Sequence, residues 1–134
     1  MTQQHINEFR VQDMIECIAR FTSTPGKGTT RLTYSAEHRD TRDYLLAKMK
    51  EAGLQTREDA VGNLFGRIEG KNPALPPVLV GSHFDSVPNG GNFDGPAGVV
   101  AGLETAFVFQ ELGLKPERSV EIIAMIEEEG GRFG

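Results

Sequence analysis

Residues 78–96 read VLVGSHFDSVPNGGNFDGP, and the expected fold is organised around this segment. The apolar run over residues 78–80 is typical of a short buried strand, and the glycines and asparagines that follow favour a loop. Pro96 suits the first turn of a helix, where a missing N–H costs nothing. The sequence therefore predicts a strand, a glycine-rich loop and a helix. Three residues that can ligate a metal lie between the strand and the helix: His83, Asp85 and Asp94.

A second strand is expected beyond this helix. Apolar residues surround most of the helix, which is typical of a buried helix, and Gly113 and Pro116 end it. Residues 119–126 then have the composition of a strand. A strand, a helix and a strand in some fifty residues predict a βαβ unit with parallel strands. The acidic run 127–129 follows the second strand, so we expect it at the same sheet edge as His83.

The N-terminal half predicts two helices and two short strands. Residues 11–21 repeat apolar side chains at helical spacing. Residues 36–52 are mostly good helix formers, with Ser35 as the expected N-cap and Gly53 as the expected left-handed C-cap. Strand-like runs follow over residues 54–57 and 63–68. A chain of 134 residues with this order of elements is expected to form one α/β domain.

The bulk composition excludes several classes of protein. The chain has 14 basic and 19 acidic side chains, a formal net charge of −5, so we expect neither nucleic acid nor an anionic membrane as a partner. No apolar run approaches the roughly 20 residues of a membrane span, and the N-terminus lacks the order of a signal peptide. Cys17 is the only cysteine, which favours a packing role and a cytoplasmic location.

The chemistry expected at the sheet edge is that of a metal centre. The neutral imidazole of His83 can bind a divalent cation, and Asp85 can accept the other ring N–H and so fix the tautomer. The carboxylate of Asp94 has two oxygens and can bridge two cations. Neighbouring residues of an extended chain face opposite ways, so of Glu128 and Glu129 one can ligate while the other takes a proton from activated water.

Each of these signals also has a simpler interpretation. A histidine after a strand is usually an ordinary core or surface residue, a glycine-rich turn with aspartate is mostly only a turn, and a glutamate run is usually solvated surface. A phosphate-binding loop is disfavoured, because Asp85 and Asp94 would repel the anion. The joint placement of the signals at one sheet edge favours the metal centre.

The sequence also resembles the N-terminal part of the M20-type metallohydrolases, specifically their hydantoinase/carbamoylase branch. This branch contains N-carbamoyl-L-amino-acid hydrolases, allantoate amidohydrolases and β-ureidopropionases. The short interval from His83 to Asp94 favours this branch over the related aminopeptidases and deacylases, whose interval is longer. The resemblance covers nearly the whole chain and lies in residues 28–32, 34–37, 61–67, 81–95 and 127–133.

The resemblance implies a role for each residue of the site. By it, His83 ligates one metal, Asp94 bridges two, and Glu129 ligates the second. Glu128 is the general base and Asp85 orients His83, whereas Glu127 is only a supporting residue. The implied cofactors are two divalent ions, zinc, manganese, cobalt or nickel. The implied reaction is attack by activated water on an N-carbamoyl amino acid or related ureide, after which carbamate breaks down to carbon dioxide and ammonia.

The resemblance further implies a larger protein than the present chain. The expected fold is part of a three-layer α/β/α zinc-peptidase-like catalytic domain with a mixed, largely parallel sheet. Family members are longer, supply two more histidine ligands downstream and insert a domain that mediates homodimerisation. His5 and His38 match neither ligand, so we expect residues 1–134 to be an N-terminal fragment of one catalytic domain. The alternatives are an allantoate-type or dipeptidase-like relative, or an inactive half-domain that binds only metal or a partner.

Overall fold

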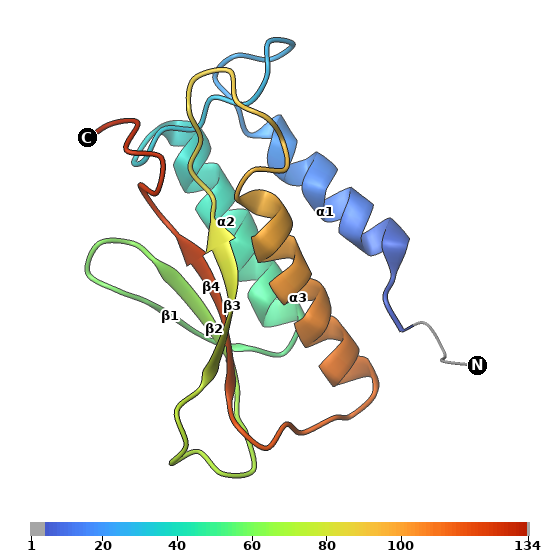
Figure 1. Ribbon diagram of the computed structural model, residues 1–134. Coiled ribbons are helices and arrows are strands. Elements are labelled where there is room, and N and C mark those ends of the chain that lie inside the picture. Colours follow the sequence, from blue (N-terminus) through green and yellow to red (C-terminus); the bar gives the residue numbers. More distant parts are fainter. Residues whose placement is uncertain (1–4, 134) are drawn as a thin grey trace.

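The computed structural model describes residues 5–133 and contains three helices and four strands in these residues (Figure 1). In chain order these are α1 (Glu8–Arg20), α2 (Ala36–Glu51), β1 (Gln55–Glu58), β2 (Leu64–Ile68), β3 (Val78–His83), α3 (Pro96–Glu111) and β4 (Val120–Met125). Each element predicted from the sequence is present. The N-cap at Ser35 is confirmed by its side chain, which accepts the N–H of His38, and Gly53 has the expected positive φ.

The four strands form one mixed sheet in the order β1-β2-β4-β3. β3 pairs with β4 in parallel, as the βαβ pattern predicts, and α3 is the crossover between them. β1–β2 and β2–β4 are antiparallel. The predicted α/β fold with a mixed sheet is confirmed. Within the described strands the antiparallel pairs outnumber the parallel one, because the short turn between β1 and β2 makes a hairpin and only β3 and β4 are joined by a helix.

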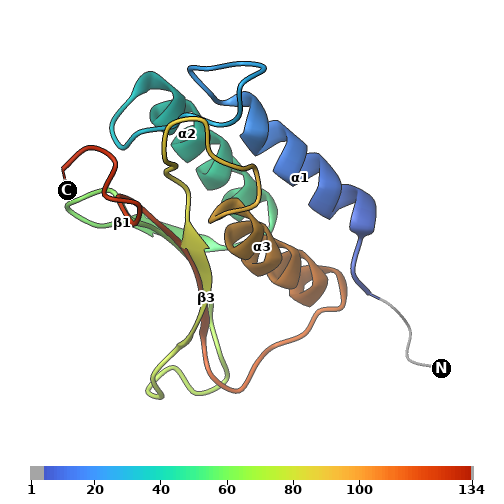
Figure 2. The same cartoon turned by 45° about the horizontal axis from the view of Figure 1, so that its top comes forward.

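The three helices lie on one face of this sheet (Figure 2). Buried residues of β2 and β4 face them, including Leu64, Ile122 and Ala124, and form the core together with apolar residues of the helices. On the other face Leu79 of β3 is 57% exposed. Within the described residues the fold is thus a sheet with one helical layer, two of the three layers expected. None of the described helices is long and apolar enough to cross a membrane.

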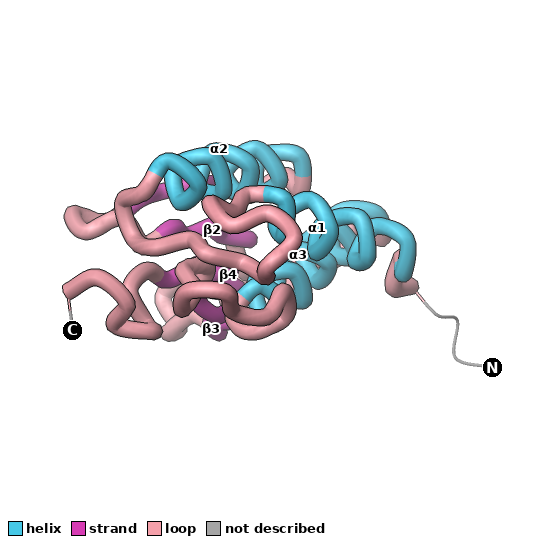
Figure 3. Tube along the Cα trace, turned by 90° about the horizontal axis from the view of Figure 1, so that it is seen from above, coloured by secondary structure: helices cyan, strands magenta, loops and turns pink. Residues whose placement is uncertain are grey.

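β3 continues further than its apolar residues predict. The sequence predicts a strand over residues 78–80, but pairing with β4 extends to His83, opposite Met125. Gly81 makes this extension possible: its φ is +152°, and a Cβ atom there would lie 1.9 Å from the carbonyl oxygen of Ile123. Both parallel strands therefore end at the same level, below the loops seen from above in Figure 3.

Candidate metal centre

His83 is the last residue of β3, and its imidazole is buried at the sheet edge. The ring Nδ1 lies 3.1 Å from the backbone carbonyl oxygen of Asp85 and 3.4 Å from the Oδ1 of the same residue. Both are acceptors, so they favour a proton on Nδ1 and leave the lone pair on Nε2. Nε2 faces the opposite way and lies 3.5 Å from Asp94 Oδ1. The imidazole is thus oriented as a metal ligand would be.

Gly95 brings Asp94 close to this ring. Its φ is +84°, and a Cβ atom there would lie 2.5 Å from the carbonyl oxygen of His83 and 2.6 Å from the ring Cε1. A side chain at this position would therefore displace the imidazole or the loop. Gly95 is also the N-cap of α3, so Asp94 is held where the glycine-rich loop enters the helix.

Glu128 and Glu129 reach the same place from the turn after β4. The backbone N–H of Glu128 donates to Asp85 Oδ1 and that of Glu129 to Asp85 Oδ2, both at 3.2 Å. The carboxylate of Glu128 lies 3.6 Å from the Nε2 of His83. Asp85 therefore contacts the imidazole on one side and the backbone of the two glutamates on the other. The second contact was not predicted from the sequence.

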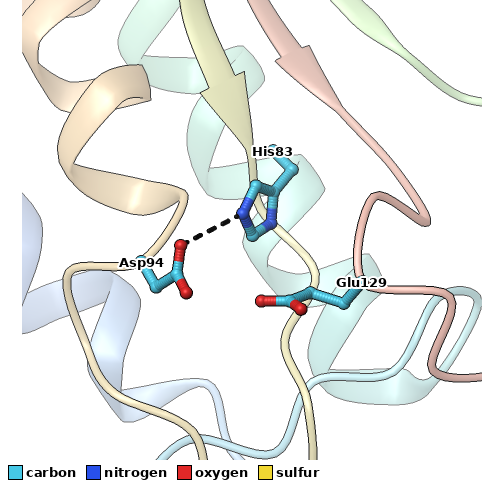
Figure 4. A group of neighbouring side chains, drawn as sticks. All are labelled: His83, Asp94 and Glu129. Carbon is cyan, nitrogen blue, oxygen red and sulfur yellow. Dashed lines mark ion pairs between the residues drawn. The ribbon is translucent and has the colours of Figure 1, made fainter.

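His83, Asp94 and Glu129 form a group that fits a metal ion (Figure 4). One ligand atom from each residue can be chosen so that all three lie within 4.8 Å of one another. The carboxylates of Asp94 and Glu129 extend from two different loops into the space beside the imidazole. One imidazole nitrogen and two carboxylates are a donor set suited to zinc, manganese, cobalt or nickel. The structure therefore brings together the three residues predicted as ligands, and places Glu128 and Asp85 beside them.

Arg31 supports the site. In the sequence it was noted only as part of the segment 28–32, which resembles the metallohydrolase family. Its side chain is buried and donates to the backbone carbonyl oxygens of Ile18, Phe21 and Phe84. Burial lowers the pKa of Arg31 to about 10, and the charge of Asp85 opposes that change. Arg31 thus fixes the backbone next to Asp85 while remaining charged at neutral pH. No local pattern marks such a residue, because its partners are distant in the sequence.

His38 does not belong to the candidate metal group, as expected. It lies on α2, buried, with its ring stacked on Phe84 at a centroid distance of 4.5 Å. Burial lowers the pKa of His38 to about 4, so the imidazole is neutral at pH 7. Its ring thus packs against the residue that precedes Asp85 in the sequence. It is a packing residue next to the site.

Comparison with known proteins places the chain in a known family of peptidases. The sequence profile of peptidase family M28 matches residues 63–134, more than half of the chain, and the chain belongs to this family. The M20 type expected from the sequence stays a prediction. The matched region contains β3, the glycine-rich loop and the turn after β4, and therefore every residue of the candidate site. A putative Zn-dependent exopeptidase from Bacteroides vulgatus has the same fold, with a TM-score of 0.72 at 18% identity.

Closer relatives lie in the hydantoinase/carbamoylase branch. An N-carbamoyl-L-amino-acid amidohydrolase of Paenarthrobacter aurescens is 53% identical over 133 residues, which are 99% of this chain and 32% of that protein. An allantoate amidohydrolase of Escherichia coli is 42% identical and is covered to the same extent, 32%. A hydantoinase/carbamoylase family amidase from Burkholderia ambifaria superimposes with a TM-score of 0.92 at 39% identity, over 96% of this chain and 32% of that one. The chain thus spans about a third of the length of these relatives.

Proposed function

We propose that this chain is the N-terminal part of the catalytic domain of a metal-dependent amidohydrolase. The substrate would be an N-carbamoyl amino acid or a related ureide, and the bond cleaved would be the C–N bond of the carbamoyl group. The observation that carries this proposal is the convergence of His83, Asp94 and Glu129, with Glu128 beside them, at the end of two parallel strands. The similarity to N-carbamoyl-L-amino-acid amidohydrolases supports the choice of substrate class.

Each residue of the site has a proposed role. His83 ligates one cation through Nε2, Asp94 bridges two cations, and Glu129 ligates the second. The exposure of Asp94, whose carboxylate lies within 4.8 Å of ligand atoms of both His83 and Glu129, supports the bridging role. The contact of Asp85 with the Nδ1 side of the ring supports its role in orienting His83. The pair of ions would be zinc, manganese, cobalt or nickel.

Glu128 is the proposed general base. Its carboxylate is 56% exposed and lies 3.6 Å from the ligating nitrogen of His83, where it can take a proton from a water molecule without leaving solvent. The cations, when bound, lower the pKa of water and polarise the carbonyl group. Glu128 then returns the proton to the leaving nitrogen as the C–N bond breaks, which yields the free amine and carbamate. Carbamate decomposes to carbon dioxide and ammonia.

The whole protein is proposed to be longer than residues 1–134. The helix-free face of the sheet, with Leu79 exposed, is the surface that a second helical layer would cover in a three-layer domain. A longer form would supply two further histidine ligands and a homodimerisation domain, as in the M20-type arrangement, and would act in the cytoplasm. With three ligands only, residues 1–134 alone are expected to show negligible turnover.

The substrate has a second candidate within the same class. Ureidoglycolate hydrolase of Arabidopsis thaliana is 42% identical over 92% of this chain, and the allantoate amidohydrolase named above is equally similar. Both names describe ureide substrates, but the higher identity to the carbamoyl-amino-acid enzyme favours that substrate. Measuring the turnover of N-carbamoyl amino acids, allantoate and ureidoglycolate by the longer form distinguishes a carbamoyl-amino-acid substrate from a ureide substrate. Activity on dipeptides alone would point to a dipeptidase-like relative instead.

The test of the general base uses the longer form with Glu128→Gln. We expect turnover to fall about 10²–10⁴-fold, because the amide cannot accept the proton, while two metal ions remain bound. Glu129→Gln is the matched variant and should lose metal instead. Glu117→Gln, on the exposed loop before β4, is the control for removal of one charge. Full activity of Glu128→Gln would remove Glu128 from this role, and a metal-free, inactive longer form would favour a module that only binds a partner.

A further inference from the structure

The turn after β4 begins with a residue in an unusual conformation. Glu127 has φ +56°, in the left-handed region that glycine adopts readily and side chains with a Cβ adopt rarely. A glycine would fit this backbone without strain. The presence of glutamate therefore suggests that its side chain does something that glycine could not do.

That side chain closes the turn on itself. Oε1 of Glu127 accepts the backbone N–H of Arg132 at 3.0 Å and that of Phe133 at 2.7 Å. The guanidinium of Arg132 in turn donates to the carbonyl oxygen of Thr33 at 3.1 Å, on the segment before α2. The far end of the turn is thus attached both to its own first residue and to a different part of the fold.

Glu128 and Glu129 lie inside the loop that Glu127 closes. Their backbone N–H groups donate to the two oxygens of the buried Asp85. Asp85, in the loop after β3, thus holds the backbone of these two residues directly, and Glu127 closes the turn that contains them. Without the contact from Glu127, the turn would keep its bonds to Asp85 and the bond from Arg132 to Thr33, but it would lose the side-chain closure between its two ends.

We propose that Glu127 is a positioning residue that holds the backbone of Glu128 and Glu129 in place for the metal centre. It neither ligates a cation nor accepts the proton of the attacking water; it acts through the hydrogen bonds that close the turn. This inference rests on the proposed function for the roles of Glu128 and Glu129. The hydrogen bonds that close the turn do not involve a cation, so they can be tested in the metal-free protein.

The first experiment measures amide hydrogen exchange by NMR in the metal-free 134-residue chain. Glu127→Gln keeps an acceptor oxygen and should keep the wild-type protection. Glu127→Ala and Glu127→Gly remove the acceptor, and we expect roughly 10-fold faster exchange or more at the amides of Glu128 and Glu129. The glycine variant relieves the backbone strain, so it tests the contact even if the alanine variant folds poorly. Unchanged protection of these two amides in Glu127→Gly would overturn the proposal.

The second experiment titrates the same variants with Co²⁺ and follows its visible absorption. Loss of a group that orients metal ligands typically costs about 10–100-fold in affinity, and we expect this loss in the alanine and glycine variants only. Glu117→Ala, which removes the same charge from another exposed loop, should bind as wild type. Equal affinity in all variants would contradict the positioning role. If wild type itself binds no Co²⁺, the proposed metal function of this chain fails, and hydrogen exchange alone decides whether Glu127 holds the turn.

Discussion

The two halves of the candidate site differ sharply in burial. The side chains of His83 and Asp85, at the end of β3, are 5% and 2% exposed. Those of Asp94 and Glu128, on the loops opposite, are 77% and 56% exposed. The buried half is assembled by contacts within the protein, whereas the exposed carboxylates extend into solvent towards the same point. The difference indicates that the imidazole is positioned before any cation binds, and that a cation would draw the exposed carboxylates to it.

The buried half is rigid because several distant segments meet there. Asp85 accepts hydrogen bonds from the turn after β4, and its neighbour Ser86 exchanges hydrogen bonds with the loop before α2, through the N–H of Arg31 and the carbonyl oxygen of Thr29. Arg31 adds a buried positive charge beside the Asp85 carboxylate. Substitutions in the buried half should therefore change both the stability of the fold and metal binding. Substitutions in the exposed half should change metal binding alone.

The largest expected effect is that of Asp85→Ala. This change leaves two backbone N–H groups without their acceptor and removes a nearby negative charge that favours the charged form of Arg31, so we expect a loss of about 3–5 kcal/mol in the free energy of unfolding. Urea denaturation followed by circular dichroism measures it. A loss below about 1 kcal/mol would show that the buried half is not held by Asp85, and the contrast with the exposed half would then fail.

The residues that meet at the candidate site could be predicted from the sequence because their signals are local. His83 and the glutamates after β4 each follow an apolar run, and the parallel pairing of a βαβ unit is a general rule, so their meeting at one edge could be predicted. Arg31 and the backbone contacts of Asp85 could not. Arg31 bonds to Phe84, 53 residues away, and Asp85 to Glu128, 43 residues away, through loops whose paths follow no periodicity.

The arrangement of the sheet was predicted less completely. The strands β1 and β2 were expected, but nothing in their sequences specifies that β2 inserts beside β4 and so places β3 at the edge of the described sheet. Strand order depends on which faces are buried by the helices, a property of the whole fold. The contacts of His38 also depend on the whole fold. Helical spacing predicts that His38 lies on α2, but it does not predict that the ring stacks on Phe84.

The second prediction concerns the acid sensitivity of the buried half through His38. Its pKa is lowered from 6.5 to about 4, mainly by burial, with Arg31 and Arg42 acting in the same direction and Asp85 and Glu127 opposing. The unfolded chain therefore binds a proton that the folded protein excludes. Stability is complete above pH 6.5 and falls as the pH decreases towards 4, by at most about 3 kcal/mol.

His38→Phe is the matched variant for this measurement, because it keeps a ring against Phe84 and cannot be protonated. The unfolding free energies of both proteins are compared between pH 7 and pH 4, so that other titrating groups cancel. Wild type should lose stability relative to the variant over this interval. Parallel curves would mean that folding does not lower the pKa of His38, and that its imidazole is not shielded from water in the folded protein.

The smallest expected effect on stability is that of Asp94→Asn, in the exposed half. Surface substitutions that break no buried contact usually change the unfolding free energy by less than about 0.5 kcal/mol, and Asp94 is exposed. Metal binding should nevertheless weaken strongly, because an amide oxygen carries no charge and is a poorer ligand for a cation. Urea denaturation and Co²⁺ titration on the same preparation test both statements. If Asp94→Asn destabilised the metal-free chain as much as Asp85→Ala, both carboxylates would stabilise the fold. Burial would then not distinguish the residues that stabilise the fold from those that only bind a cation.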